Sequence, residues 1–333
     1  MRACKIVSFS VVILLITVVF AGVVTVPAAA QSDTTQFRYD ATHAGDYSPV
    51  AGSDMSNGKL MWNHTTGDGV DSSPAVLNGV LYVGSDDNNT YALNATTGTK
   101  VWNYTTSSAV LSSPAVVNGT VYVGSDDNNT YALNATTGTK LWNYTTGSAV
   151  YSSPAVVNGT VYVGSDDRNV YALNATTGTK VWNYTTGDYV ASSPAVVNGT
   201  VYVGSYDSNV YALNATTGTK VWNYTTSSAL LSSPAVVNGT VYVGSYDSNV
   251  YALNATTGKL TWSFTTGDEV LSSPAVVNGT VYVGSEDRNV YAIGNAAAAT
   301  SQSTTPGLEV VLAIVGLVFV GLVITAYVVR RRS

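Results

Sequence analysis

Short stretches of apolar residues alternating with polar or small ones recur along the chain, and each ends in a turn sequence. Residues 120–125 (TVYVGS) are rich in β-branched and aromatic side chains, which is typical of a strand. The preceding pair, Asn118 and Gly119, is a strong hairpin signal, and the following run, 126–129 (DDNN), closes tight turns through its side chains. The same succession returns every 40 residues, so the pattern predicts a repeat protein.

One repeat predicts four strands, at 112–117, 120–125, 130–134 and 140–145. Pro114 lies in the first of them, and proline is tolerated in edge strands but not in central ones. The two middle strands are apolar on both faces, so each small sheet has to be covered by a neighbour on either side. We therefore expect an all-β fold in which four-stranded antiparallel sheets, the blades, surround an axis as a β-propeller.

The number of repeats predicts six blades. Six tryptophans stand 40 residues apart, at Trp62, Trp102, Trp142, Trp182, Trp222 and Trp262. Residues 59–65 have the sequence of a fourth strand, whereas the last repeat, 272–293, has only three strands. We expect the N-terminal strand to complete the last blade and close the ring. An open solenoid would instead leave exposed sheet edges, which promote aggregation.

Both ends of the chain carry targeting signals. Residues 1–30 have a basic start, a long apolar run and a small-residue cleavage pattern, which predicts a secretory signal peptide or, if it stays uncleaved, an anchor. A leader at 31–58, the propeller at 59–295 and a polar linker at 296–307 follow. Residues 308–329 are long and apolar enough for a transmembrane helix, and the basic tail at 330–333 predicts an extracellular propeller.

Residues 92–102 (ALNATTGTKVW) resemble the tryptophan-docking motif AxDxxTGxxxW of PQQ-like, quinoprotein-type β-propellers. The motif recurs four more times, with asparagine always in place of the aspartate, and these copies end at Trp142, Trp182, Trp222 and Trp262. The resemblance implies a six-bladed PQQ-like β-propeller. It also implies that each tryptophan docks on the neighbouring blade and has a structural role.

The C-terminal tail is similar to archaeal surface-protein sorting signals of the PGF-CTERM type. It combines a Thr-rich spacer, an apolar span and terminal arginines, but its triplet reads Pro306, Gly307 and Leu308. The resemblance implies that a sorting enzyme removes the span and adds a lipid, whereas the alternative is an ordinary retained span. Both alternatives predict a membrane-anchored, monomeric propeller at the cell surface.

The composition of the chain argues against nucleic-acid binding and against PQQ-dependent catalysis. The net charge of −6 argues against a nucleic-acid partner, and the one cysteine, Cys4, lies in the predicted signal peptide. The quinoprotein dehydrogenases of the resembled family bind PQQ and calcium with an active-site Asp and usually a cysteine pair. Their propellers usually have eight blades. This chain has no cysteine in its repeats, and its carboxylates recur blade by blade. We therefore expect no catalytic residues, no PQQ, no calcium or other metal, and no enzyme activity.

One face of the propeller concentrates the differences between repeats. The loops between second and third strands, and those between blades, hold fifteen of the 20 carboxylates. The candidate binding residues on this face are Asp87, Asp127, Asp167, Arg168, Tyr206, Asp207, Tyr246, Asp247, Glu286 and Asp287. They suit a cation, an amine or a basic protein patch, with the tyrosines as stacking surfaces. In the alternative interpretation, the repeated aspartates only cap their own turns.

Seventeen N-x-[ST] sequons are present, and in an exported protein they are potential glycan sites. The candidates taken from the first repeats are Asn63, Asn94, Asn103, Asn118, Asn134 and Asn158. The alternative is that Asn-Gly-Thr and Asn-Ala-Thr are turn and strand sequences copied by duplication.

Together these features predict a non-catalytic binding or adhesion module at the cell surface. Its partner would be a surface protein, a glycan or a cell-wall component, which the sequence does not specify. The alternatives are an envelope assembly scaffold and a PQQ-dependent redox protein. A quinone chromophore with calcium-dependent dye reduction would favour the redox protein, because only that function needs an oxidising cofactor.

Overall fold

The computed structural model describes residues 58–277 and 279–294, which cover the predicted propeller almost completely. The predicted signal peptide, leader, linker, C-terminal span and basic tail lie outside the described residues, apart from Gly58 of the leader. Within the described part of the chain, no helix is long and apolar enough to cross a membrane. All regular structure there is β-strand, as the sequence predicts.

The strands form six separate antiparallel sheets, each built from strands consecutive in the chain. Blade 1 consists of β1 (Ala75–Leu77), β2 (Val80–Gly84), β3 (Asn89–Asn94) and β4 (Lys100–Thr105). Blade 2 consists of β5 (Ala115–Val117), β6 (Thr120–Gly124), β7 (Asn129–Asn134) and β8 (Lys140–Thr145). Blade 3 consists of β9 (Ala155–Val157), β10 (Thr160–Gly164), β11 (Asn169–Asn174) and β12 (Lys180–Thr185).

Blade 4 consists of β13 (Ala195–Val197), β14 (Thr200–Gly204), β15 (Asn209–Asn214) and β16 (Lys220–Thr225). Blade 5 consists of β17 (Ala235–Val237), β18 (Thr240–Gly244), β19 (Asn249–Asn254) and β20 (Leu260–Thr265). Blade 6 has three strands, β21 (Ala275–Val277), β22 (Thr280–Gly284) and β23 (Val290–Ile293). The prediction of six blades in an all-β propeller is confirmed.

The turns follow from local sequence. In blade 2 the first hairpin has positive φ at both central residues, 49° at Asn118 and 73° at Gly119, which is the two-residue turn that Asn-Gly favours. Between the third and fourth strands, the Asn134 side chain accepts hydrogen bonds from the backbone N–H groups of Thr136 and Thr137. This turn also places Gly138 at a φ of 70°, which a residue with a side chain adopts only with strain.

Five of the six tryptophans dock on the blade that follows them in the chain. Trp102 of blade 1 is buried, and its indole N–H donates to the Ala135 carbonyl of blade 2 over 2.9 Å. The ring covers Gly138, where a Cβ would lie only 2.7 Å from it. Trp62, Trp142, Trp182 and Trp222 dock in the same way on the motifs that follow them, whereas no described motif follows Trp262.

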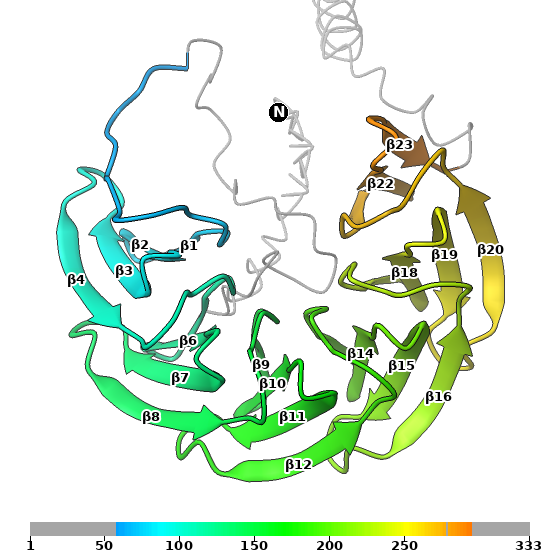
Figure 1. Cartoon of the computed structure of the whole chain (residues 1–333), viewed down its shortest axis with the longest axis horizontal. Helices are drawn as coiled ribbons and strands as arrows, with labels where there is room; N and C mark the ends of the chain where they lie inside the picture. The colour runs from blue at the N-terminus through cyan, green and yellow to red at the C-terminus, as the bar shows by residue number, and fades with distance from the viewer. Residues whose placement is uncertain (1–57, 278, 295–333) are drawn as a thin grey trace, which may run out of the picture. The chain divides into compact units, whose positions relative to one another are not determined.

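A chain of serines joins the blades at their inner strands. The backbone N–H of Ser113 in blade 2 donates to the Ser153 hydroxyl of blade 3 over 2.9 Å. The same bond links five consecutive pairs: Ser73 to Ser113, Ser113 to Ser153, Ser153 to Ser193, Ser193 to Ser233, and Ser233 to Ser273. The blades therefore follow one another about a common axis, with the first strand of each innermost (Figure 1).

The expected closing strand is not formed, and that prediction is wrong for this structure. Residues 59–65 are not a strand, and among the described strands β23 pairs only with β22. Among the described residues, Trp62 donates to the Ala95 carbonyl of blade 1, and Gly67, just after this segment, donates to the Asp87 carboxylate of the same blade. Val290 on β23 is consequently 81 % exposed, and Figure 1 shows the blue N-terminal segment apart from β23.

Candidate functional site

The loop between the second and third strands contains two adjacent positions with opposite roles. At the second position, both Asp127 oxygens are used: one accepts from the Tyr131 hydroxyl (2.6 Å) and the Ser107 N–H (2.9 Å), the other from the Asn129 N–H (3.1 Å). Burial opposes ionisation of Asp127, but these hydrogen bonds outweigh it and hold its pKa below the usual value.

The predicted face residues at this second position are all committed to the fold. Each aspartate accepts from the tyrosine four residues later in its own blade and from a backbone N–H twenty residues earlier. This holds for Asp87, Asp127, Asp167, Asp207, Asp247 and Asp287. The alternative interpretation of these aspartates, that they hold turns, therefore accounts for their contacts.

At the first position, three blades present aspartates, and we call Asp86, Asp126 and Asp166 the acidic arc. One oxygen of each is buried and has no hydrogen-bond partner among the described residues. Burial and then neighbouring carboxylates raise the pKa of all three; Asp86 acts on Asp126, and Asp126 acts on Asp166. The charges that act on the arc are thus all negative, and the side chains repel one another.

Blades 4 and 5 carry tyrosines at the same position. Tyr206 and Tyr246 share a hydrogen bond between their hydroxyls (3.3 Å), and Tyr189 of the preceding loop packs against Tyr206 with ring centroids 6.3 Å apart. We call Tyr189, Tyr206 and Tyr246 the tyrosine arc. Burial, the hydrogen bond to Tyr246 and the charge of Asp166 raise the pKa of Tyr206. The effect of Asp166 indicates that the Tyr206 ring lies near the acidic arc.

A cavity of about 740 Å³ lies on the axis, with lining residues from all six blades. Asp166, Tyr151 and Asp71 contribute to its wall, and so do Tyr189 and Tyr206. Burial and the charges of Asp126 and Asp166 raise the pKa of Tyr151. The remaining lining residues are Ser73, Leu111, Ser113, Ser153, Ala191, Ser193, Leu231, Leu271 and Ser273. Although the fold is repetitive, the wall of this cavity is not, because only some blades contribute a carboxylate or a tyrosine to it.

The other predicted face residues lie outside this constellation. Arg168 adopts a φ of 73° and serves its turn through the backbone, because its carbonyl accepts from Thr186. Glu286 of blade 6 occupies the first position of its loop but is exposed. Across residues 58–277 and 279–294, no group of three or more His, Cys, Asp or Glu side chains could hold a metal ion.

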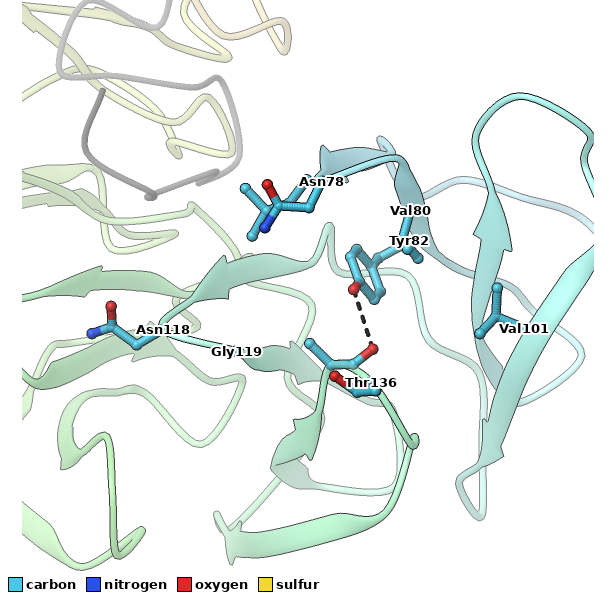
Figure 2. A pocket seen from close by; sticks show the side chains of 9 residues that line it. Asn78, Val80, Tyr82, Val101, Asn118, Gly119 and Thr136 are labelled. Atoms are coloured by element: carbon cyan, nitrogen blue, oxygen red, sulfur yellow. Dashed lines mark hydrogen bonds between the residues drawn. The ribbon is translucent and has the colours of Figure 1, made fainter. Parts of the chain in front are cut away.

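A second hollow of about 340 Å³ lies between blades 1 and 2, near the hairpins of the opposite face (Figure 2). Leu77, Val80 and Val101 line it together with backbone and hairpin asparagines. The Tyr82 hydroxyl crosses it to donate to the Ala135 carbonyl (3.2 Å), and the same bond recurs between Tyr122 and Ala175. It contains no charged side chain, so the axial cavity is the candidate site.

Of the face residues predicted from the sequence, Tyr206 lines the axial cavity, whereas the predicted aspartates hold turns and Asp166 of the arc was not among the candidates. The useful signal was variation among repeats: the second position is Asp in all six blades, whereas the first reads Asp, Asp, Asp, Tyr, Tyr and Glu. A position that is the same in every blade serves the fold common to all blades. Tyr151 and Tyr189, in the loops between blades, were missed because side-chain direction in such loops is not periodic.

The sequence matches the family model described as outer membrane protein assembly factor BamB over residues 48–155, 147–236 and 225–302. These matches cover most of the chain, which therefore belongs to this family of PQQ-like repeat propellers. Among curated proteins, none has a sequence that matches the chain.

Solved structures with the same fold include a designed protein, Ika8, at 19 % identity and a TM-score of 0.62, covering 67 % of this chain and 70 % of its own. BamB from Moraxella catarrhalis is 21 % identical with a TM-score of 0.50, over 71 % of this chain and 88 % of that one. Quinohemoprotein alcohol dehydrogenase ADHIIG from Pseudomonas putida HK5 is 23 % identical with a TM-score of 0.58. The match covers 69 % of this chain and 47 % of that one. At these identities the likeness concerns the fold alone.

Proposed function

We propose that this protein is a non-catalytic binding module at the cell surface, and that its axial cavity takes an organic cation, such as a lysine or arginine side chain of a surface protein. The observation that carries the proposal is the acidic arc, whose member Asp166 lines a cavity that also contains Asp71 and three tyrosines. An assembly-scaffold role is the second candidate, favoured by the description of the family, and would use the same contact.

The energetics favour a cationic ligand. A buried polar atom without a hydrogen bond costs about 1–3 kcal/mol, whereas the free energy of unfolding of a domain is about 5–15 kcal/mol. Three such atoms therefore lower the stability of the free protein considerably. An ammonium or guanidinium group in the cavity beside Asp166 would offset the repulsion between the carboxylates of the arc. Tyrosine rings attract the same cations through their negative faces, by about 0.5–2 kcal/mol.

A redox function through PQQ does not fit the described residues. The likeness to a quinohemoprotein dehydrogenase is one of fold, and that chain is covered only over 47 % of its length. No described group of carboxylates fits the calcium ion that accompanies PQQ in such enzymes. We derive no chemical step through that cofactor, and the absence of enzyme activity stays a prediction.

The proposal is tested by calorimetric titration of the full chain in detergent with a lysine-rich peptide. We expect the peptide to bind, its fully acetylated form not to bind, and the affinity to fall as salt is raised. Asp166→Asn should weaken binding because Asp166 lines the cavity. Glu286→Gln is the matched control, since it removes the same charge at the equivalent exposed position. Equal weakening by both variants, or binding of the acetylated peptide, would refute an axial site.

A further inference from the structure

We propose that N-glycans are attached to the hairpin asparagines between the first and second strands, Asn118, Asn158, Asn198 and Asn238, and not to the other sequons of the repeats. The inference rests on the proposed function only in placing the domain outside the membrane. Each repeat offers up to four kinds of sequon, and the structure treats them differently. A glycosyltransferase needs the asparagine amide nitrogen and the hydroxyl two residues later, both within reach.

The sequons of the fourth strands have both groups engaged. The Asn103 side-chain nitrogen donates to the Asn89 amide oxygen over 2.9 Å, and the hydroxyl of Thr105 donates to the same oxygen over 2.6 Å. Asn143, Asn183 and Asn223 repeat this arrangement. Asn63, which precedes blade 1, is exposed and lacks this bond, so it joins the open sites.

The sequons between the third and fourth strands belong to the lock between blades. In the sequon that starts at Asn134, the middle residue Ala135 is buried. Its carbonyl accepts from both the Trp102 indole and the Tyr82 hydroxyl. Presenting this segment to an enzyme would undock the tryptophan. The copies at Asn174, Asn214 and Asn254 have equivalent tyrosine and tryptophan bonds, although Ala175 is half-buried. In the copy at Asn94, the half-buried Ala95 accepts from the Trp62 indole.

The sequons in the loops of the axial face are blocked at their threonine. In the sequon that starts at Asn128, the hydroxyl-bearing residue is Thr130, which is fully buried. Thr90 in the sequon of Asn88 is equally buried. A transferase therefore cannot reach the hydroxyl that it has to recognise, even though the asparagine is half-exposed.

The hairpin sequons differ from the other kinds because their asparagine side chains are exposed and take no part in the bonds between blades. Asn118 is exposed, its side chain makes no hydrogen bond among the described residues, and nothing lies within 4 Å of a Cβ built on Gly119. The half-buried Thr120 bonds the Tyr122 hydroxyl through its own hydroxyl, whereas the Asn118 amide that would carry the glycan stays exposed. Gly119 accepts from Ala135, which places these hairpins beside the third-to-fourth-strand turns, on the face opposite the axial loops. Glycans there would shield that face and leave the axial cavity open.

The test measures glycan occupancy at each sequon by mass spectrometry of peptides from the full chain isolated from its native membranes. We expect glycan at Asn63, Asn118, Asn158, Asn198 and Asn238, and its absence at the described sequons of the three other kinds. Glycan on Asn103, Asn128 or Asn134, or no glycan on any hairpin asparagine, would overturn the proposal. Neither outcome bears on the binding of the lysine-rich peptide, so the two proposals fail separately.

Two variants provide a matched comparison that spares the fold. Thr120→Val removes the sequon of Asn118, and valine already occupies this position in blade 1 as Val80. Thr130→Val removes the sequon of Asn128, and valine already occupies this position in blade 3 as Val170. We expect the first variant to lose the mass of one glycan and the second to lose none. The reverse result, or loss from both, would contradict the assignment.

Discussion

At the scale of single residues, neighbouring aspartates of one loop have opposite effects on stability. Hydrogen bonds hold the pKa of Asp127 low, so its stabilising contribution is present above the usual carboxyl pKa and is lost as the pH falls through the lowered value. Burial and like charges raise the pKa of Asp126, so its ionised form costs stability once the pH rises from the usual pKa through the raised value.

These opposite shifts predict opposite effects of one substitution. Asp127→Asn should lower the free energy of unfolding by about 1–3 kcal/mol at pH 7. Both Asp127 oxygens accept hydrogen bonds, and the amide nitrogen that replaces one of them in asparagine cannot accept. Asp126→Asn should stabilise it at pH 7, and this gain should vanish below the usual carboxyl pKa. Urea unfolding at pH 7 and pH 3 measures both effects. Destabilisation by Asp126→Asn at pH 7 would contradict the assigned repulsion.

Turn chemistry predicted the structural role of Asp127, since Asp followed by Asn two residues later forms side-chain bonds to its own backbone. The strain on Asp126 could not be predicted from local sequence. It arises first from burial and then from Asp86, which stands 40 residues away in the chain and meets Asp126 only because the blades are stacked. Contacts of this kind depend on the rotation between blades, which the repeat length does not determine.

At the scale of the strand, the first strand of each blade is shorter than its sequence suggests. The pattern predicts a strand at 112–117, but β5 begins at Ala115. The Ser112 hydroxyl accepts from Gly124 N–H and donates to Gly124 carbonyl, and Ser113 bonds the next blade. These side chains replace the ladder bonds that a longer strand would make, which periodicity of apolar residues does not reveal.

The glycine that ends the second strand is predicted to be essential where the blades are stacked. A Cβ on Gly124 would lie 2.4 Å from the Val150 side chain and 2.6 Å from its carbonyl, and backbone cannot yield cheaply. Gly124→Ala should therefore cost about 1–3 kcal/mol of unfolding free energy. At Gly284 in blade 6 the nearest atom would be 3.6 Å away, at Ser272.

Gly284→Ala is thus the matched control for Gly124→Ala. We expect it to be neutral or to stabilise by up to about 1 kcal/mol, because alanine restricts the unfolded chain. Thermal unfolding of both variants measures the difference. Equal destabilisation by the two substitutions would show that close packing of Val150 is not the reason for the glycine at position 124.

At the scale of the whole molecule, the repeat symmetry predicted a closed ring, but the last blade lacks the N-terminal strand that would close it. Six repeats and a spare fourth strand at the N-terminus favour a sealed ring, and the six blades are present. The segment at 59–65 is nevertheless held by Trp62 and Asp87 contacts on blade 1, and no described strand bonds the outer edge of β23. Counting repeats gives the number of blades but not which contacts hold the last strand.

The open edge predicts uneven hydrogen exchange. Amides of β23 that point toward the missing fourth strand should exchange fast, whereas equivalent amides of β19 should be protected by β20. Exchange measured by mass spectrometry on the full chain resolves the two strands. Equal protection would mean that residues 59–65 pair with blade 6 after all.

The claim on which the functional account depends is that a cation is the missing partner of the acidic arc. The most direct measurement is a ¹³C NMR pH titration of the Asp126 and Asp166 carboxyl groups, with and without the lysine-rich peptide. We predict pKa values above the usual range in the free protein and a marked fall in both when the peptide is bound. Ordinary pKa values in the free protein, or values that the peptide leaves unchanged, would contradict the account.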